Sequence, residues 1–165
     1  MELTLKPLLD KDIELFCKWL NKDYIYKWLC PDGEEYREAW LDEVKNRNTK
    51  YPYMKHFIVY YNDVAIGFCL YMDCYFDREY IPEHYGIIVE EEGTAFEIGY
   101  LIGEEEYLNK GIGKLIVRKL EETIAATGGK EILADPAEEN IVSIKTLLSN
   151  GFVKVKDGDY RKQIK

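Results

Sequence analysis

The sequence predicts one α/β domain that spans residues 1–165. Runs rich in β-branched and aromatic residues alternate with segments whose apolar residues recur at helical spacing. The chain is 165 residues long and 47% hydrophobic, so it has the length of a single domain and can bury a core without staples. No repeat, low-complexity segment or linker divides it.

The N-terminal part is expected to contain a strand followed by two helices. Residues 3–8, LTLKPL, have the composition of a first strand. Residues 10–20 are predicted to be helical because apolar side chains recur there at i, i+3, i+4 and i+7; these are Ile13, Phe16, Cys17 and Leu20. A second helix is expected within residues 32–47.

The middle of the chain combines a hairpin, a long loop and a strand. Two β-rich runs in residues 56–72 flank Asn62 and Asp63 and predict an antiparallel hairpin. Residues 73–93 show no sustained periodicity and are expected to form a loop, and loops of this length in compact domains are usually functional or mobile. Apolar residues alternate along residues 94–103, which predicts a central strand.

The C-terminal part is predicted to alternate helices with strands. We expect a helix over residues 111–126, a strand over 130–135 and a helix over 138–148 that stops before Gly151. Residues 152–164 are predicted to form a hairpin around an Asp-Gly turn.

The charge and the apolar runs exclude several function classes. Because 31 Asp and Glu face 22 Lys and Arg, the net charge of −9 disfavours binding of nucleic acid and favours cationic partners. The longest apolar run, residues 66–72, is too short to cross a membrane, and the first residues do not resemble a signal peptide. We therefore expect a cytoplasmic protein with reduced cysteines. The spacing of its four Cys and two His predicts no metal site.

Gly111 and Gly113 lie where a turn leads into the helix of residues 111–126. A helix N-terminus offers unpaired N–H groups and the positive end of a dipole, and glycine lets an anion approach the backbone. The spacing fits neither a nucleotide-triphosphatase loop nor a dinucleotide fingerprint. Taken alone, this stretch is explained equally well by a phosphate-binding site and by a tight turn that lets the helix and the strand pack.

A second motif accompanies these glycines. The segments YLNKGIGKLIVRKL and EILADPAEENIVSIKTLLSNGF together resemble the acetyl-CoA signature of the GNAT N-acetyltransferase superfamily, and the resemblance spans essentially the whole chain. Within the superfamily, the segments WLNKDYIYKWL, AIGF and ADPAEEN are similar to the aminoglycoside 6′-N-acetyltransferase branch. The resemblance implies the α/β (α+β) GNAT acyl-CoA N-acyltransferase fold, with a central mixed, mostly antiparallel sheet flanked by helices.

The same resemblance implies acetyl-CoA as cosubstrate. The backbone that would hold its pyrophosphate comprises Asn109, Lys110, Gly111, Ile112, Gly113 and Lys114. The residues expected to pair with the pantetheine arm as an added strand are Ile98, Gly99, Tyr100 and Leu101. Asn140 and Ser143 are expected to contact the same arm, although Asn140 is also a plausible helix N-cap.

Two positions depart from the superfamily pattern. Leu147 stands where most relatives carry a tyrosine that protonates the departing thiolate, and Leu108 replaces the usual Gln or Arg. Because a thiol has a pKa near 8.5, its thiolate already leaves tolerably at neutral pH, so the missing acid need not abolish turnover.

Three residues are candidates for the chemistry. An attacking amine must lose a proton, and Glu97, on the central strand, is the first candidate for the base. Asp135, at the end of the next strand, is the second, and a contact with the substrate's ammonium group suits it better. The backbone N–H of Tyr100 is a candidate oxyanion donor. For Glu97 a solvated strand carboxylate is the alternative.

Acceptor recognition is expected in residues 73–92 and in the early helices. Carboxylates and aromatic rings suit a polyamine or an aminosugar, and the candidates are Trp28, Asp73, Tyr75, Asp77, Glu79 and Asp135. Three hypotheses remain open: acetylation of a small cationic amine, acetylation of a protein N-terminus or lysine, and non-catalytic binding of an acyl-CoA. The oligomeric state is not predicted.

Overall fold

The computed structural model describes residues 2–164. Its strands form one seven-stranded sheet in the order β1-β2-β3-β4-β5-β7-β6. The strands are β1 (Leu3–Pro7), β2 (Met54–Tyr61), β3 (Val64–Asp73), β4 (Ala95–Ile102), β5 (Glu131–Ala134), β6 (Val153–Lys156) and β7 (Asp159–Gln163). Only β4 and β5 run parallel, and the other neighbours are antiparallel. The predicted mixed, mostly antiparallel sheet is confirmed.

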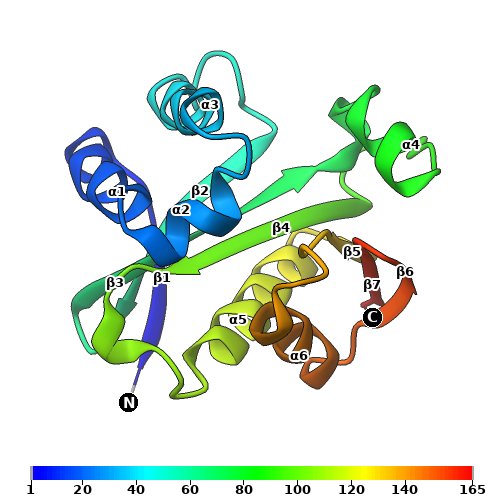
Figure 1. Cartoon of the computed structure of the whole chain (residues 1–165). Coiled ribbons are helices and arrows are strands. Elements are labelled where there is room, and N and C mark those ends of the chain that lie inside the picture. Colours follow the sequence, from blue (N-terminus) through cyan, green and yellow to red (C-terminus); the bar gives the residue numbers. More distant parts are fainter. Residues whose placement is uncertain (1, 165) are drawn as a thin grey trace.

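Helices cover both faces of this sheet (Figure 1). They are α1 (Ile13–Leu20), α2 (Asp23–Leu29), α3 (Glu34–Lys45), α4 (Tyr80–Tyr85), α5 (Ile112–Ala126) and α6 (Ile141–Ser149). One core joins α5 and Leu147 to Val59, Ile98 and other sheet residues. A second core joins α1, α2 and α3 to the opposite face, through Phe68 and Leu101 among others, and a third groups Ile81 and Tyr85 of α4 with Leu133.

The parallel pair β4 and β5 separates after three residue pairs. Ala95, Phe96 and Glu97 pair with residues 131–133, but β4 continues to Ile102 while β5 ends at Ala134. Beyond Glu97, β4 keeps β3 on one side and has no strand on the other among residues 2–164. The sheet therefore opens into a gap, and the free edge of β4 forms one side of it.

Two helices were missing from the sequence prediction. The first, α2, lies between the two expected early helices, and the second, α4, lies inside the expected loop of residues 73–93. The loop is tied to the C-terminal hairpin, because Arg161 Nη2 donates to the carbonyl of Tyr85 (3.0 Å) and the ring of His84 bonds to the carbonyl of Gly158 (2.8 Å). The predicted hairpin of β2 and β3 turns at Asn62 and Asp63, both of which have a positive φ, as this type of two-residue turn requires.

Candidate active site

A cleft of about 640 Å³ opens where β4 and β5 separate. Glu97, Ile98, Gly99 and Tyr100 line one wall, Ala134 and Asp135 line another, and Asn140, Ser143 and Leu147 come from α6 and its N-cap. The cleft continues toward α2 and α3, where its lining residues include Trp28, Tyr36, Trp40 and Glu43. Two predicted groups, the strand residues 97–100 and Asp135, therefore share one cleft.

Successive side chains of β4 lie on opposite faces of the sheet. Phe96 and Ile98 belong to the core under α5, whereas Leu101 belongs to the core under α1–α3. Because side chains alternate along a strand, Glu97 points to the same face as Leu101. Its carboxylate thus lies on the face where α4 and Asp135 meet.

Two tyrosine hydroxyls from α4 contact the carboxylates of Glu97 and Asp135. Tyr85 donates to Glu97 Oε2 at 2.6 Å, and the Tyr80 hydroxyl lies 2.9 Å from the same oxygen. The Tyr80 hydroxyl also bonds to Asp135 Oδ2. The Nε2 atom of His84 is 4.0 Å from Asp135 Oδ2.

Burial dominates the electrostatics of this group. Removal from water, together with the charge of Asp135, raises the pKa of Glu97 to about 8, while the hydrogen bonds from Tyr85 and Tyr80 lower it. The surrounding protein also raises the pKa of Asp135 above its usual range, even though 41% of its side-chain surface is exposed. That surface is accessible because Asp135 lines the open cleft. A carboxyl with a pKa near the working pH is suited to general-base catalysis.

The raised pKa of Glu97 predicts a pH-dependent cost to stability. Between about pH 4.5 and pH 8 the unfolded chain has lost the Glu97 proton while the folded chain keeps it, so the free energy of unfolding decreases as pH rises. The limiting slope is about 1.4 kcal/mol per pH unit for one proton. Glu97→Gln removes this loss, so the variant should gain stability relative to the parent between pH 5 and pH 8 in urea titrations. Parallel stability curves over that range would contradict it.

The predicted phosphate loop presents free donors at the N-terminus of α5. Asn109 and Gly111 have φ values of 59° and 76°, and a Cβ added at Gly111 would meet no atom within 4 Å. Within residues 2–164, the backbone N–H groups of residues 109–114 donate no hydrogen bond. Gly113 packs beside the Tyr100 ring, which its added Cβ would meet at 3.4 Å, so the loop adjoins the free edge of β4. An anion fits this arrangement of open space, unpaired N–H groups and helix dipole.

A comparison with family models decides the classification. The model described as an acetyltransferase (GNAT) domain matches residues 8–160. The chain belongs to the GNAT family of acetyltransferases. Because the match covers nearly all of the chain, this GNAT chain is an acetyltransferase, and the predicted fold and enzyme class are confirmed.

Solved structures share the fold of this GNAT protein at low identity. The aminoglycoside acetyltransferase AAC(6')-Ib in complex with coenzyme A is 22% identical, with a TM-score of 0.72, over 98% of this chain and 95% of that chain. An aminoglycoside N(6')acetyltransferase from Legionella pneumophila is 19% identical, with a TM-score of 0.69, over 99% and 93%. Spermidine N-acetyltransferase from Vibrio cholerae, in complex with CoA and spermine, is 17% identical, with a TM-score of 0.70, over 98% and 92%.

The GNAT fold places the candidate cofactor residues of α6 at the cleft. The Asn140 side chain caps α6 by accepting from the Ser143 N–H at 3.3 Å, so the N-cap role exists whether or not Asn140 also contacts a ligand. Ser143 Oγ lies 3.4 Å from the Tyr100 hydroxyl. Leu147 is 1% exposed and lines the cleft, so an apolar side chain lies at this point of the cleft wall.

The acceptor candidates of this GNAT chain are dispersed. Trp28 and Asp135 line the cleft, but the four candidates within residues 73–92 are absent from the lining among the described residues. Asp73 accepts from the N–H groups of Tyr75 and Gly93 and closes the loop, while Asp77 accepts from the N–H of Tyr80 at the start of α4. Tyr75 stacks on Arg78, and Glu79 is the N-cap of α4. Direct substrate contacts by these four residues stay a prediction.

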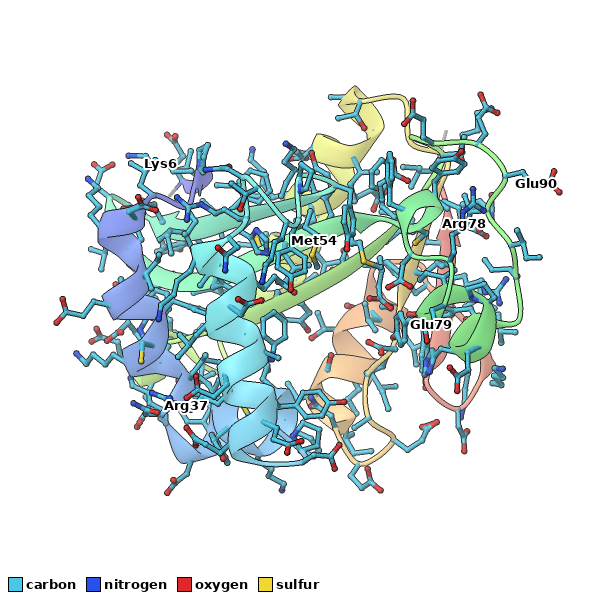
Figure 2. All side chains as sticks on the ribbon, turned by 90° about the horizontal axis from the view of Figure 1, so that it is seen from above. Lys6, Arg37, Met54, Arg78, Glu79 and Glu90 are labelled. Carbon is cyan, nitrogen blue, oxygen red and sulfur yellow. The ribbon has the colours of Figure 1, made fainter. Side chains whose placement is uncertain are left out.

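Figure 2 shows where this acidic segment lies. Glu79 is beside α4, whereas Glu90 points outward from the molecule, away from Met54, a residue of the cleft wall. The outer part of the segment is thus remote from the cleft.

Two features of the site were not predicted from the sequence. Tyr80 and Tyr85 were not among the candidates, because no periodic pattern predicts the helix α4 that carries both. Glu43 lines the cleft from α3, and its Oε2 atom is 2.7 Å from Nε2 of the fully buried His56 side chain. No local pattern connects Glu43 with His56, because the contact depends on how α3 packs on β2.

Among residues 2–164, no group of three His, Cys, Asp or Glu side chains is arranged to hold a metal ion. The described helices include none with both the length and the apolar character needed to cross a membrane.

Proposed function

We propose that the protein transfers the acetyl group of acetyl-CoA to a primary amine of a small cationic substrate, directly and with Glu97 as general base. The observation that carries the proposal is the position of the Glu97 carboxyl. It lies at the point where β4 loses its second neighbour, between the unpaired strand edge and the acidic side of the cleft. Membership of the GNAT family supports acetyl-CoA as the donor.

The donor half of the cleft fits a pyrophosphate joined to an extended arm. The free N–H groups of residues 109–114 suit the pyrophosphate, with Lys110 and Lys114 adding positive charge, and the edge of residues 98–101 suits the arm as an added strand. Bound acetyl-CoA supplies an activated thioester carbonyl. The fold neighbours solved with coenzyme A include AAC(6')-Ib and the spermidine N-acetyltransferase, which is consistent with this use of the cleft.

Glu97 performs the proton transfer in this scheme. A primary amine has a pKa near 10 and is protonated at neutral pH, so its nitrogen must lose a proton before it can attack. The Glu97 carboxylate accepts that proton, and its raised pKa makes it a better base than an exposed glutamate. The Tyr100 N–H remains the candidate to polarise the thioester carbonyl.

The acceptor half of the cleft is acidic. Its lining contains Glu43, Glu97, Asp135 and Glu139 against one cation, Lys27, among the described residues. Carboxylates beside the rings of Trp28 and Trp40 suit a substrate with several ammonium groups and an apolar body. Fold neighbours named for aminoglycosides and for spermidine act on substrates of this kind.

Glu43 is expected to hold a second ammonium group of the acceptor. Glu43→Gln keeps an oxygen that can accept from His56 but removes the charge, so it should raise the Michaelis constant for a polyamine about five- to twentyfold, the range of one charge-assisted contact. The constant for a monoamine should barely change. Glu35→Gln, at an exposed position of the same helix, is the matched control. Equal effects on both amines would contradict this role.

The rate of thiol release from acetyl-CoA across a panel of acceptors tests the proposed function. The panel contains monoamines, polyamines, aminoglycosides, and basic peptides with a free N-terminus or a lysine. The proposal predicts the highest specificity constants for small polycations. Preference for the peptides would favour a protein acetyltransferase, and binding of acetyl-CoA without any amine-dependent release would favour a non-catalytic module.

A further inference from the structure

Tyr80 occupies a special place between the two acids of the cleft. Among the described residues it is the side chain whose hydroxyl contacts both Glu97 and Asp135. Its helix is held on both sides: Asp77 caps the first turn by accepting from the Tyr80 N–H at 2.8 Å, and Arg161 binds the carbonyl of Tyr85. The bridge is therefore built on a fixed element.

The Tyr80 hydroxyl, which bridges Glu97 and Asp135, has a single proton to share between them. A phenol has one proton, so Tyr80 cannot donate to two carboxylates at once. Tyr85 already donates to Glu97 Oε2, and when Tyr80 donates to Asp135 its oxygen is left facing that same Glu97 atom at 2.9 Å. This last contact is a hydrogen bond only when Glu97 holds a proton, which is the state of a general base that has just acted.

We propose that Tyr80 is a proton relay that passes the proton of Glu97 to Asp135. The inference rests on the proposed function, in which Glu97 takes that proton from the acceptor amine. The O–H bond of Glu97 breaks as the Tyr80 oxygen takes its proton, and the O–H bond of Tyr80 breaks as its own proton moves to Asp135 Oδ2. Glu97 is again a carboxylate and Tyr80 a neutral phenol. Asp135, with 41% of its side chain exposed, then releases the proton to water.

Charged groups around the bridge act on both acids. Asp77 and Asp135 disfavour charge on Glu97, and the buried Cys74 thiol lies near the Glu97 backbone. On the far side, His84 stacks on the Tyr80 ring with centroids 5.2 Å apart, and its effect lowers the pKa of Asp135, which favours release of the proton from Asp135 to water. Glu97 lines the cleft beside α4, and among the described residues Tyr80 is the side chain that connects it to the exposed acid.

The test compares Tyr80→Phe with Tyr85→Phe at saturating acetyl-CoA and amine. Both variants remove a hydrogen-bond partner of Glu97, and Tyr85→Phe, which removes the bond donated to the carboxylate, should move the acidic limb of the pH–rate profile to higher pH. Only Tyr80→Phe should lower kcat on its alkaline plateau, by about ten- to hundredfold, within the usual range for proton transfer. Imidazole added at fixed pH and ionic strength should restore that loss, after subtraction of the rate without enzyme, and should not affect Tyr85→Phe.

A double-mutant cycle supplies the second readout. Because the relay ends at Asp135, adding Asp135→Asn to Tyr80→Phe should lower kcat no further than the larger single effect. Should Tyr80→Phe not fold, Asp135→Asn alone must show the same rescue by imidazole. Equal losses in the two tyrosine variants without rescue would overturn the relay and leave both tyrosines as hydrogen-bond partners of the base. The proposed function fails separately, if wild type shows no amine-dependent thiol release or Glu97→Gln has no effect.

Discussion

Glu97→Gln is expected to lower kcat/KM by about 10²- to 10⁴-fold at neutral pH, the usual contribution of a general base. The substitution keeps the shape of the side chain and can still accept from Tyr85, but it cannot take a proton. The loss should shrink as pH approaches the pKa of the amine itself, because an already neutral amine needs no base. The wild-type profile should show an acidic limb near pH 8, set by Glu97, which the variant lacks.

Steady-state rates from pH 6 to pH 9.5 test this expectation. Calorimetric titration with acetyl-CoA is the control, because the donor half of the cleft does not use the Glu97 carboxylate. A rate loss that stays constant over the whole range would assign Glu97 a positional role. An unchanged rate would move the base to Asp135 or to bulk water.

Gly111→Val is expected to weaken the binding of acetyl-CoA by at least about tenfold, or 1.4 kcal/mol. With φ at 76°, position 111 disfavours any L side chain by about 1–2 kcal/mol, and most of all a β-branched one. The added side chain has space, but that space adjoins the free N–H groups of residues 109–114. A bulky group there keeps a pyrophosphate from reaching them.

Gly128→Val is the matched control for this experiment. Gly128 also has a positive φ, 92°, and an added Cβ there would likewise meet no atom within 4 Å, but it lies beyond the C-terminus of α5. Both variants should lose similar stability in thermal unfolding, and only the variant at position 111 should lose affinity for acetyl-CoA. An unchanged dissociation constant in that variant would refute the phosphate loop.

The elements that could be predicted from the sequence are those with a local pattern of apolar residues. The alternation in residues 94–103 and the apolar spacing in residues 111–126 identify β4 and α5, because each pattern reports the face that is buried. The hairpin turn at Asn62 and Asp63 was likewise readable. The GNAT resemblance added the mixed, mostly antiparallel sheet flanked by helices and the expected pairing of residues 98–101 with the pantetheine arm.

The missing features depend on contacts between distant segments. The helix α4 has only six residues and contains Pro82, so its own sequence gives little helical signal. It is held in place by Asp77, Arg161 and the carbonyl of Gly158. The sequence likewise gives no sign that the loop carboxylates Asp73 and Asp77 accept backbone N–H groups, and direct contacts of either residue with a substrate stay a prediction. Only the folded chain shows that Tyr80 bridges two acids.

Amine-dependent thiol release by the wild-type protein, measured with one polyamine and one monoamine beside Glu97→Gln, tests the proposed function most directly. We predict release that requires both acetyl-CoA and amine, saturates with each, is more efficient with the polyamine, and falls at least about a hundredfold in the variant at neutral pH. Saturable binding of acetyl-CoA with no release above the no-amine rate for either acceptor would contradict it.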